Sequence, residues 1–116
     1  MEVGNYVRTK SYGIKKINGF SSTLEEDFID CDYNKTTRIL INKKDIIKSS
    51  PNILDLIEEN DFINGMRITQ IISNKNGVLE CMKDSDYEFI TTITNNEVES
   101  VLTHEQFESM EYRIGE

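Results

Sequence analysis

The chain has 116 residues, a formal net charge of −8 and an isoelectric point near 4.7. This length suits one ordinary domain, or two very small domains that share a core. The acidic excess argues against direct nucleic-acid binding, because the nucleic-acid backbone is a dense polyanion. No apolar run approaches the roughly 20 residues that a membrane-spanning helix needs, so we expect no contact with a membrane.

The two cysteines, Cys31 and Cys81, form no CxxC motif. The N-terminus carries Glu2 and lacks the apolar stretch of a secretory signal. We therefore expect a cytoplasmic protein, in a bacterial host cell, whose thiols are reduced.

Residues 3–17, VGNYVRTKSYGIKKI, predict a strand, a turn and a second strand, since apolar and polar residues alternate with a period of two. Asn18-Gly19 predicts the turn that ends the second strand. The segments 28–33 and 38–42 predict two further strands, and in the first of them Cys31 alternates onto the apolar face. Ser50 then predicts the cap of a helix that has Pro51 at its first position.

The same series returns in the second half of the chain. Residues 59–72, ENDFINGMRITQII, repeat the first phrase, and Asn76-Gly77 repeats the turn. The segments 78–83 and 89–94 match the third and fourth strands, with Cys81 in the place of Cys31. Thr103 with Gln106 has the pattern of a capping box. A repeat carried through four strands and a helix cap predicts an internal duplication.

The predicted fold is mainly β, with two tandem SH3-like small β-barrel repeats, each closed by a short helix. The repeats span residues 1–57 and 58–116 and are expected to pack as one compact unit. A unit of this size buries little apolar surface alone, so we expect the copies to share an apolar face. The helix predicted for PNILDLIEEN, residues 51–60, would join them. Both cysteines are expected to be buried core thiols.

Catalytic chemistry is not indicated. The single histidine, His104, is predicted to be an exposed residue in the first turn of a helix. No motif of a hydrolase, nucleotide-binding enzyme or metalloprotease occurs. We predict a protein that is not an enzyme and that holds no cofactor and no metal ion.

Three stretches, VGNYVRTKSYGIKKI, KDIIKSSPNILDLIEENDFING and VESVLTHEQFESMEYRIGE, cover most of the chain. In these stretches the sequence resembles a group of small proteins encoded by phages and prophages of low-GC Gram-positive bacteria. The resemblance implies a phage setting and assigns no functional residue. Small acidic phage proteins of this kind often antagonise host defences, CRISPR nucleases included.

Two acidic clusters are the predicted contact surface, because carboxylates spaced along a sheet can imitate a phosphate backbone. They are Glu25, Glu26, Asp27, Asp30 and Asp32 in the first copy, and Glu80, Asp84, Asp86 and Glu88 in the second. The leading hypothesis is that the protein binds and inhibits a host defence factor, such as a CRISPR effector, whose surface is basic or nucleic-acid-binding. A homodimer is left open.

Two alternatives are kept. The first is a sponge that sequesters a nucleotide defence signal through cations and aromatic rings. Its candidate residues are Tyr6, Arg8, Phe62, Arg67, Tyr112 and Arg113. The second is a structural or assembly component of the virion.

Overall fold

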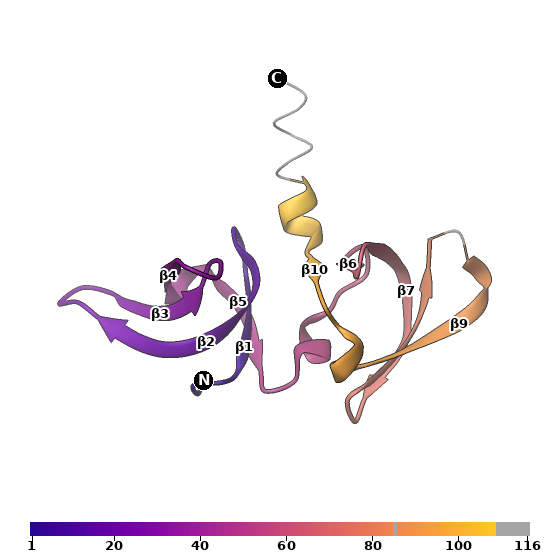
Figure 1. The fold of residues 1–116 in the computed structure, drawn as a ribbon, viewed down its shortest axis with the longest axis horizontal. Coiled ribbons are helices and arrows are strands. Elements are labelled where there is room, and N and C mark those ends of the chain that lie inside the picture. Colours follow the sequence, from indigo (N-terminus) through magenta and orange to yellow (C-terminus); the bar gives the residue numbers. More distant parts are fainter. Residues whose placement is uncertain (85, 109–116) are drawn as a thin grey trace, which may run out of the picture.

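The chain folds into two antiparallel sheets of five strands each, which lie side by side (Figure 1). The structure is a computed structural model, and it describes residues 1–84 and 86–108, with the backbone alone for residues 86–88. The prediction of a mainly β protein is confirmed. None of the helical segments in the described ranges has the length and apolar character needed to cross a membrane.

The first sheet contains β1 (Tyr6–Thr9), β2 (Gly13–Ser22), β3 (Asp27–Asp32), β4 (Arg38–Asn42) and β5 (Ile46–Ser50). Its strand order is β4-β3-β2-β1-β5. A 3₁₀ turn, η1 (Lys43–Asp45), connects β4 to β5, and its first residues are capped by the Asn42 side chain, which accepts a hydrogen bond from the Lys44 N–H. A second 3₁₀ turn, η2 (Ile53–Leu56), leads into the second sheet.

The second sheet contains β6 (Phe62–Ile63), β7 (Met66–Lys75), β8 (Val78–Lys83), β9 (Asp86–Thr94) and β10 (Val101–Leu102). Its strand order is β10-β6-β7-β8-β9, which is the order of the first sheet. The 3₁₀ turn η3 (Asn95–Glu97) precedes the last strand, as η1 does. A helical turn over residues 104–108 follows β10, which rises between the two sheets (Figure 1).

The correspondence between the sheets extends to single residue pairs. Ile17 lies opposite Cys31 in the first sheet, and Ile71 lies opposite Cys81 in the second. In both sheets the strand register shifts directly after this pair, so each has a β-bulge at the same place. Beyond the bulge, Phe20 occupies in the first sheet the position that Asn74 occupies in the second.

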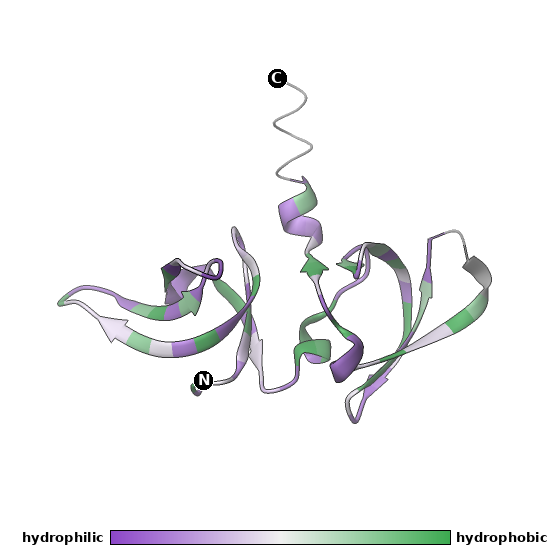
Figure 2. Cartoon of the chain, viewed as in Figure 1, coloured by the Kyte–Doolittle hydropathy of each residue, from purple (hydrophilic) through white to green (hydrophobic). Residues whose placement is uncertain are grey.

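Each sheet has its own hydrophobic core, and Figure 2 shows hydrophobic residues recurring along its strands. The first core consists of Val7, Ile17, Ile29, Cys31 and Ile41. The second consists of Leu54, Ile57, Ile63, Ile68, Leu79 and Cys81, with Ile14 packed against it. Residues of both halves meet in the second core, where Leu54, Ile57 and Ile14 of the first half pack against residues of the second. Among the described residues, no side chain of the second half belongs to the first core.

The two predicted Asn-Gly turns differ. Asn76 and Gly77 have φ values of 56° and 73° and form the two-residue turn between β7 and β8, as predicted. Asn18 and Gly19 instead lie inside β2, at the bulge, and no turn forms there.

The helix predicted after the first copy, over residues 51–60, does not form. Pro51 and Asn52 precede only the short η2 turn, and the Ser50 hydroxyl accepts the Asn52 N–H and donates to Asp55 Oδ2 at 2.6 Å. The capping box of the second copy is confirmed. Gln106 Oε1 accepts the Thr103 N–H at 3.2 Å, and Thr103 Oγ1 accepts the Gln106 N–H at 3.3 Å.

Candidate partner-binding surface and buried arginine cluster

Four of the nine predicted contact carboxylates have partners within their own sheet. Asp30 forms an ion pair with Arg38 on the neighbouring strand. Three more have hydrogen-bond partners: Asp32 with Asn18, Glu80 with Ser73 and Asp84 with Arg67. Arg38 and Arg67 offset the charge of two of these carboxylates, whereas Asn18 and Ser73 are neutral partners. The described carboxylates on the strands therefore do not form a continuous unpaired ridge. The side chains of Asp86 and Glu88 lie outside the described residues.

The other three carboxylates gather at the turn between β2 and β3. Glu25 and Asp27 are exposed, and Glu26 lies 3.7 Å from the ammonium group of Lys44, a contact largely screened by solvent. Thr23 holds the turn, because its Oγ1 accepts the Glu26 N–H at 3.1 Å and its own N–H donates to the Glu26 carbonyl at 2.8 Å. The strands therefore carry these carboxylates on a defined turn at the far end of the first sheet.

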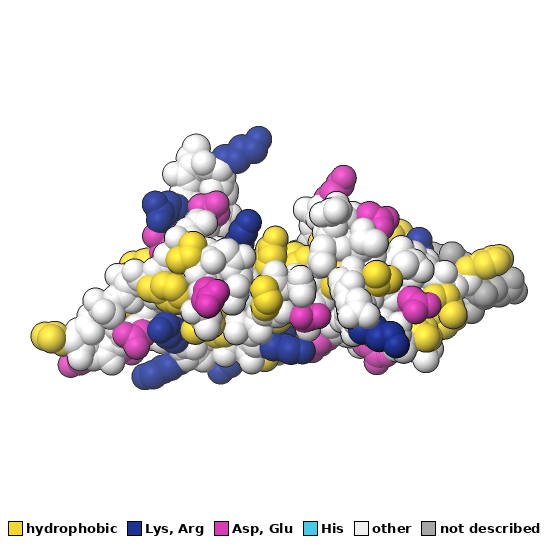
Figure 3. Space-filling view, turned by 90° about the horizontal axis from the view of Figure 1, so that it is seen from below, with side chains coloured by type: hydrophobic (Ala, Val, Ile, Leu, Met, Phe, Trp, Pro, Cys, Tyr) yellow, Lys and Arg dark blue, Asp and Glu magenta, His cyan; other side chains and the backbone are white. Residues whose placement is uncertain are grey.

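Leu24 lies at the tip of this turn and is fully exposed, at 106%. Figure 3 shows a hydrophobic side chain at the left extremity of the molecule, where Figure 1 places the β2–β3 hairpin. Sequence reasoning considered only the acidic neighbours of Leu24. The break in alternation at STLEED was the available signal, since an apolar residue in a polar turn has no core to enter.

A shallow hollow of about 260 Å³ adjoins the hairpin, and it is lined by Phe20, Ser21, Ser22, Asp27 and Lys43. The Phe20 ring is 47% exposed, and the Lys43 ammonium group lies 5.4 Å from its centroid. An exposed aromatic ring and an exposed leucine therefore lie at the same end of the first sheet. We name the Leu24 turn and this hollow the hairpin surface.

The matching end of the second sheet is closed by the chain itself. Leu54 of η2 is fully buried in the second core. Its carbonyl accepts the Asn74 side-chain N–H at 2.7 Å, and its N–H donates to Asn95 Oδ1 at 3.4 Å. The strand register places Phe20 and Lys43 at these two positions in the first half. The described part of the chain supplies no equivalent of Leu54 there.

Arg8, a predicted ligand-binding residue, is fully buried and holds the two halves together. Its guanidinium group donates to both oxygens of Asp61 at 2.6 and 2.8 Å, and to the Leu56 carbonyl at 2.9 Å. It also donates to both oxygens of Glu105, with the longer contact at 3.1 Å. All five N–H donors are used, so Arg8 has none to offer a phosphate. Burial lowers the pKa of Arg8, but the hydrogen bonds that Arg8 donates to Asp61 and Glu105 outweigh this effect, so the pKa is raised.

The other residues predicted to bind a ligand do not all lie together in the structure. Phe62 and Arg67 line one hollow of about 560 Å³ together with Phe107, whose ring centroid lies 5.2 Å from that of Phe62. Tyr6 lies apart, with the Lys16 ammonium group 5.9 Å from its ring. Tyr112 and Arg113 lie outside the described residues. Asp84 and Glu108 also line the hollow, so it carries carboxylates that would oppose an anionic ligand.

His104 is not the exposed residue that the sequence predicted. Its side chain is 26% exposed, and Nε2 lies 3.0 Å from Glu58 Oε1. The hydrogen bond to Glu58 raises the pKa of His104, and Glu105 and Asp61 add to the effect. The His104 backbone N–H donates to Asp61 Oδ1 at 2.9 Å, which connects the helical turn to the arginine cluster.

Cys31 and Cys81 are both fully buried free thiols, so the prediction of core cysteines is confirmed. Burial raises the pKa of Cys31 to about 11 and also raises that of Cys81. Both are therefore protonated and poor nucleophiles at neutral pH.

No family model, no curated protein and no solved structure matches this chain.

Proposed function

We propose that this chain is a non-catalytic, phage-type accessory protein that binds and inhibits a host defence protein through the hairpin surface. The observation that carries the proposal is the fully exposed Leu24, near the exposed carboxylates Glu25 and Asp27, which have no ion-pair partner in the described part of the chain. A large apolar side chain surrounded by charge is the usual composition of a contact centre with a polar rim. The phage-like sequence motifs supply the setting.

The chemistry of the surface defines its partner. Leu24 and Phe20 require an apolar depression, and the three carboxylates require cations at its rim. A nucleic-acid-binding protein offers such cations, and electrostatic attraction would speed its association with this acidic chain. Inhibition then follows from occupation of the partner's basic surface, without any chemical step.

The architecture of each half supports an SH3-like repeat. Five antiparallel strands, a 3₁₀ turn before the last strand and pairing of the last strand with the first occur in both sheets. Matching bulges and matching cysteines support descent of both halves from one copied module. In this proposal η2 packs against the end of the second sheet that carries Asn74. The equivalent end of the first sheet, which carries Phe20, is available for a partner.

Capture from host lysate tests the proposal. Tagged wild-type protein is expected to retain a basic protein that mass spectrometry identifies. The double variant Glu25→Lys and Asp27→Lys is expected to lose it, because like charges then meet at the rim. The variant Glu2→Lys and Glu99→Lys makes the same change in net charge at exposed positions elsewhere and should retain the partner. Equal capture by both variants would show that the hairpin surface is not the contact.

A further inference from the structure

The imidazole of His104 faces carboxylates from two segments of the chain. Nε2 lies 3.0 Å from Glu58 Oε1, and Nδ1 lies 3.6 Å from Glu105 Oε2. Each of these three residues has a ligand atom within 4.8 Å of the other two. Ligand atoms around a tetrahedral zinc ion are about 3.4 Å apart, because each lies about 2.1 Å from the metal. One zinc ion can use only one of the two ring nitrogens, because Nδ1 and Nε2 point away from each other. The three ligand atoms lie up to 4.8 Å apart, so the carboxylate side chains must turn toward that nitrogen to coordinate the ion.

Negative charge exceeds positive charge around this imidazole. Asp61, Glu58 and Glu105 all lie against Arg8, with Glu58 Oε2 3.3 Å from its Nε. Glu108 Oε1 adds a further carboxylate 3.5 Å from His104 Nδ1. Protonation of His104 offsets one unit of this excess, whereas a divalent cation offsets two. A cation is thus favoured where several partly buried carboxylates share one guanidinium group.

The cluster is open to solvent on one side. His104 and Glu108 line the hollow of about 560 Å³, and the Glu58 side chain is 45% exposed. An ion and its water ligands can enter from there, which a metal site requires. Asp61 is fully buried and committed to Arg8, so it is not a ligand in this arrangement.

We propose that Glu58, His104 and Glu105 bind one divalent transition-metal ion, with zinc the best match to one imidazole and two carboxylates. Water completes the coordination from the side of the hollow. The ion joins the segment after η2 to the helical turn over residues 104–108. Binding therefore fastens the last described segment of the chain to the junction between the two halves.

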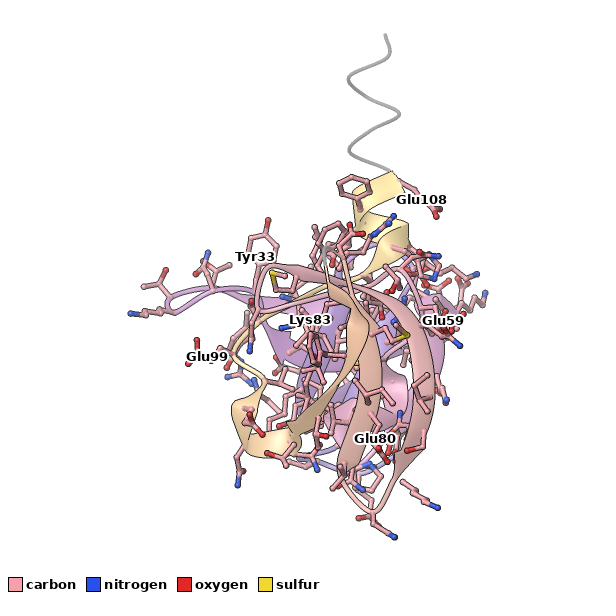
Figure 4. All side chains as sticks on the ribbon, turned by 90° about the vertical axis from the view of Figure 1, so that its right-hand side faces the viewer. Tyr33, Glu59, Glu80, Lys83, Glu99 and Glu108 are labelled. Atoms are coloured by element: carbon pink, nitrogen blue, oxygen red, sulfur yellow. The ribbon has the colours of Figure 1, made fainter. Side chains whose placement is uncertain are left out.

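The sole histidine of the chain provides a direct measurement, because only one imidazole contributes NMR signals. The untagged full-length protein is titrated with zinc chloride at pH 7.5 while the ¹⁵N shifts of His104 are followed. We expect a saturable shift at one equivalent, and at least tenfold weaker binding in Glu58→Gln. Glu99→Gln is the matched control, because Glu99 lies between η3 and β10, away from Glu108 (Figure 4), and should bind zinc as the wild type does.

Affinity should also rise with pH, since the metal requires a neutral imidazole. Zinc bound at a thiol instead would leave the imidazole shifts unchanged and would contradict the site. An unsaturable titration of the wild type would overturn it as well. Equal zinc affinity of Glu58→Gln and wild type would also overturn the site. The glutamine side chain of this variant keeps a hydrogen-bond acceptor for His104, and circular dichroism checks that the variant is folded.

Discussion

Arg8 and Asp61 show how a pair of charged residues can decide the arrangement of a whole chain. Arg8 comes from β1, and its partners come from the segment after η2 and from the helical turn over residues 104–108. Two buried charges stabilise a fold only when their geometry satisfies nearly every donor and acceptor. The bidentate contact with Asp61 and the contact with the Leu56 carbonyl meet that condition.

Removal of the arginine is expected to be costly. Arg8→Met leaves Asp61 buried without its cation and should lower the free energy of unfolding by about 3–5 kcal/mol. Urea denaturation followed by circular dichroism measures the change. Arg38→Met removes the cation of an exposed pair and should leave the unfolding midpoint nearly unchanged. A loss in Arg8→Met no larger than that in Arg38→Met would contradict the structural role of Arg8.

The pH dependence of stability follows from His104 and Glu105. The pKa of His104 is raised above 6.5 in the folded protein, so its contribution is complete below pH 6.5 and is lost as the pH rises through the folded value. Burial would raise the pKa of Glu105, but the hydrogen bonds from Arg8 lower it below 4.5, so its contribution is lost as the pH falls below that value. The melting temperature should therefore decline on both sides of mildly acidic pH. His104→Gln should flatten the decline above pH 6.5, and an unchanged decline would exclude His104 as its cause.

At the scale of elements, local signals in the sequence were enough for most strands and for the order in which they repeat. Segments 38–42 and 78–83 were predicted at the bounds that β4 and β8 have. In the second segment, Leu79 and Cys81 alternate with Glu80 and Met82, which marks a half-buried strand. Asn18-Gly19 was predicted wrongly, since a bulge and a turn both favour glycine. Whether an Asn-Gly dipeptide forms a bulge or a turn depends on how the strands pair, and a local sequence pattern does not contain that information.

The candidate sites were harder to predict for the same reason. The partners of Asp30 and Arg8 come from other strands or from the far half of the chain, and their pairing removed both from the predicted surfaces. Leu24 was overlooked because an apolar residue is ordinarily assigned to a core. Only the folded chain shows that η2 closes one sheet, while no equivalent segment among the described residues closes the same end of the other.

The two Asn-Gly dipeptides offer a matched pair of substitutions. Gly77→Ala places a side chain at φ 73°, and its Cβ would lie 2.9 Å from Asn95 Nδ2, so we expect a loss of about 1–2 kcal/mol. Gly19→Ala adds a Cβ where nothing lies within 4 Å and should be tolerated. Thermal denaturation compares the two variants. Equal losses would mean that both positions have the same backbone conformation, against the structure.

In the whole molecule, the two halves have the same strand topology but contribute differently to the core and to the available surface. The first half contributes Leu54, Ile57 and Ile14 to the second core. Glu105 of the second half accepts hydrogen bonds from Arg8 of the first. The second half is therefore closed by the first, and β10 and the following helical turn lie at the junction (Figure 1). What stays available is the hairpin surface of the first half, at the outer end of the first sheet (Figure 1).

We propose that this acidic chain acts by occupying a host defence protein with its hairpin surface. The decisive experiment is phage plating on a panel of defended bacterial strains that express the protein. We expect wild type and the Glu2→Lys, Glu99→Lys variant to restore plaque formation on the same strain, and Glu25→Lys, Asp27→Lys not to restore it. Restoration by the hairpin variant, or no restoration by wild type on any strain of the panel, would contradict it.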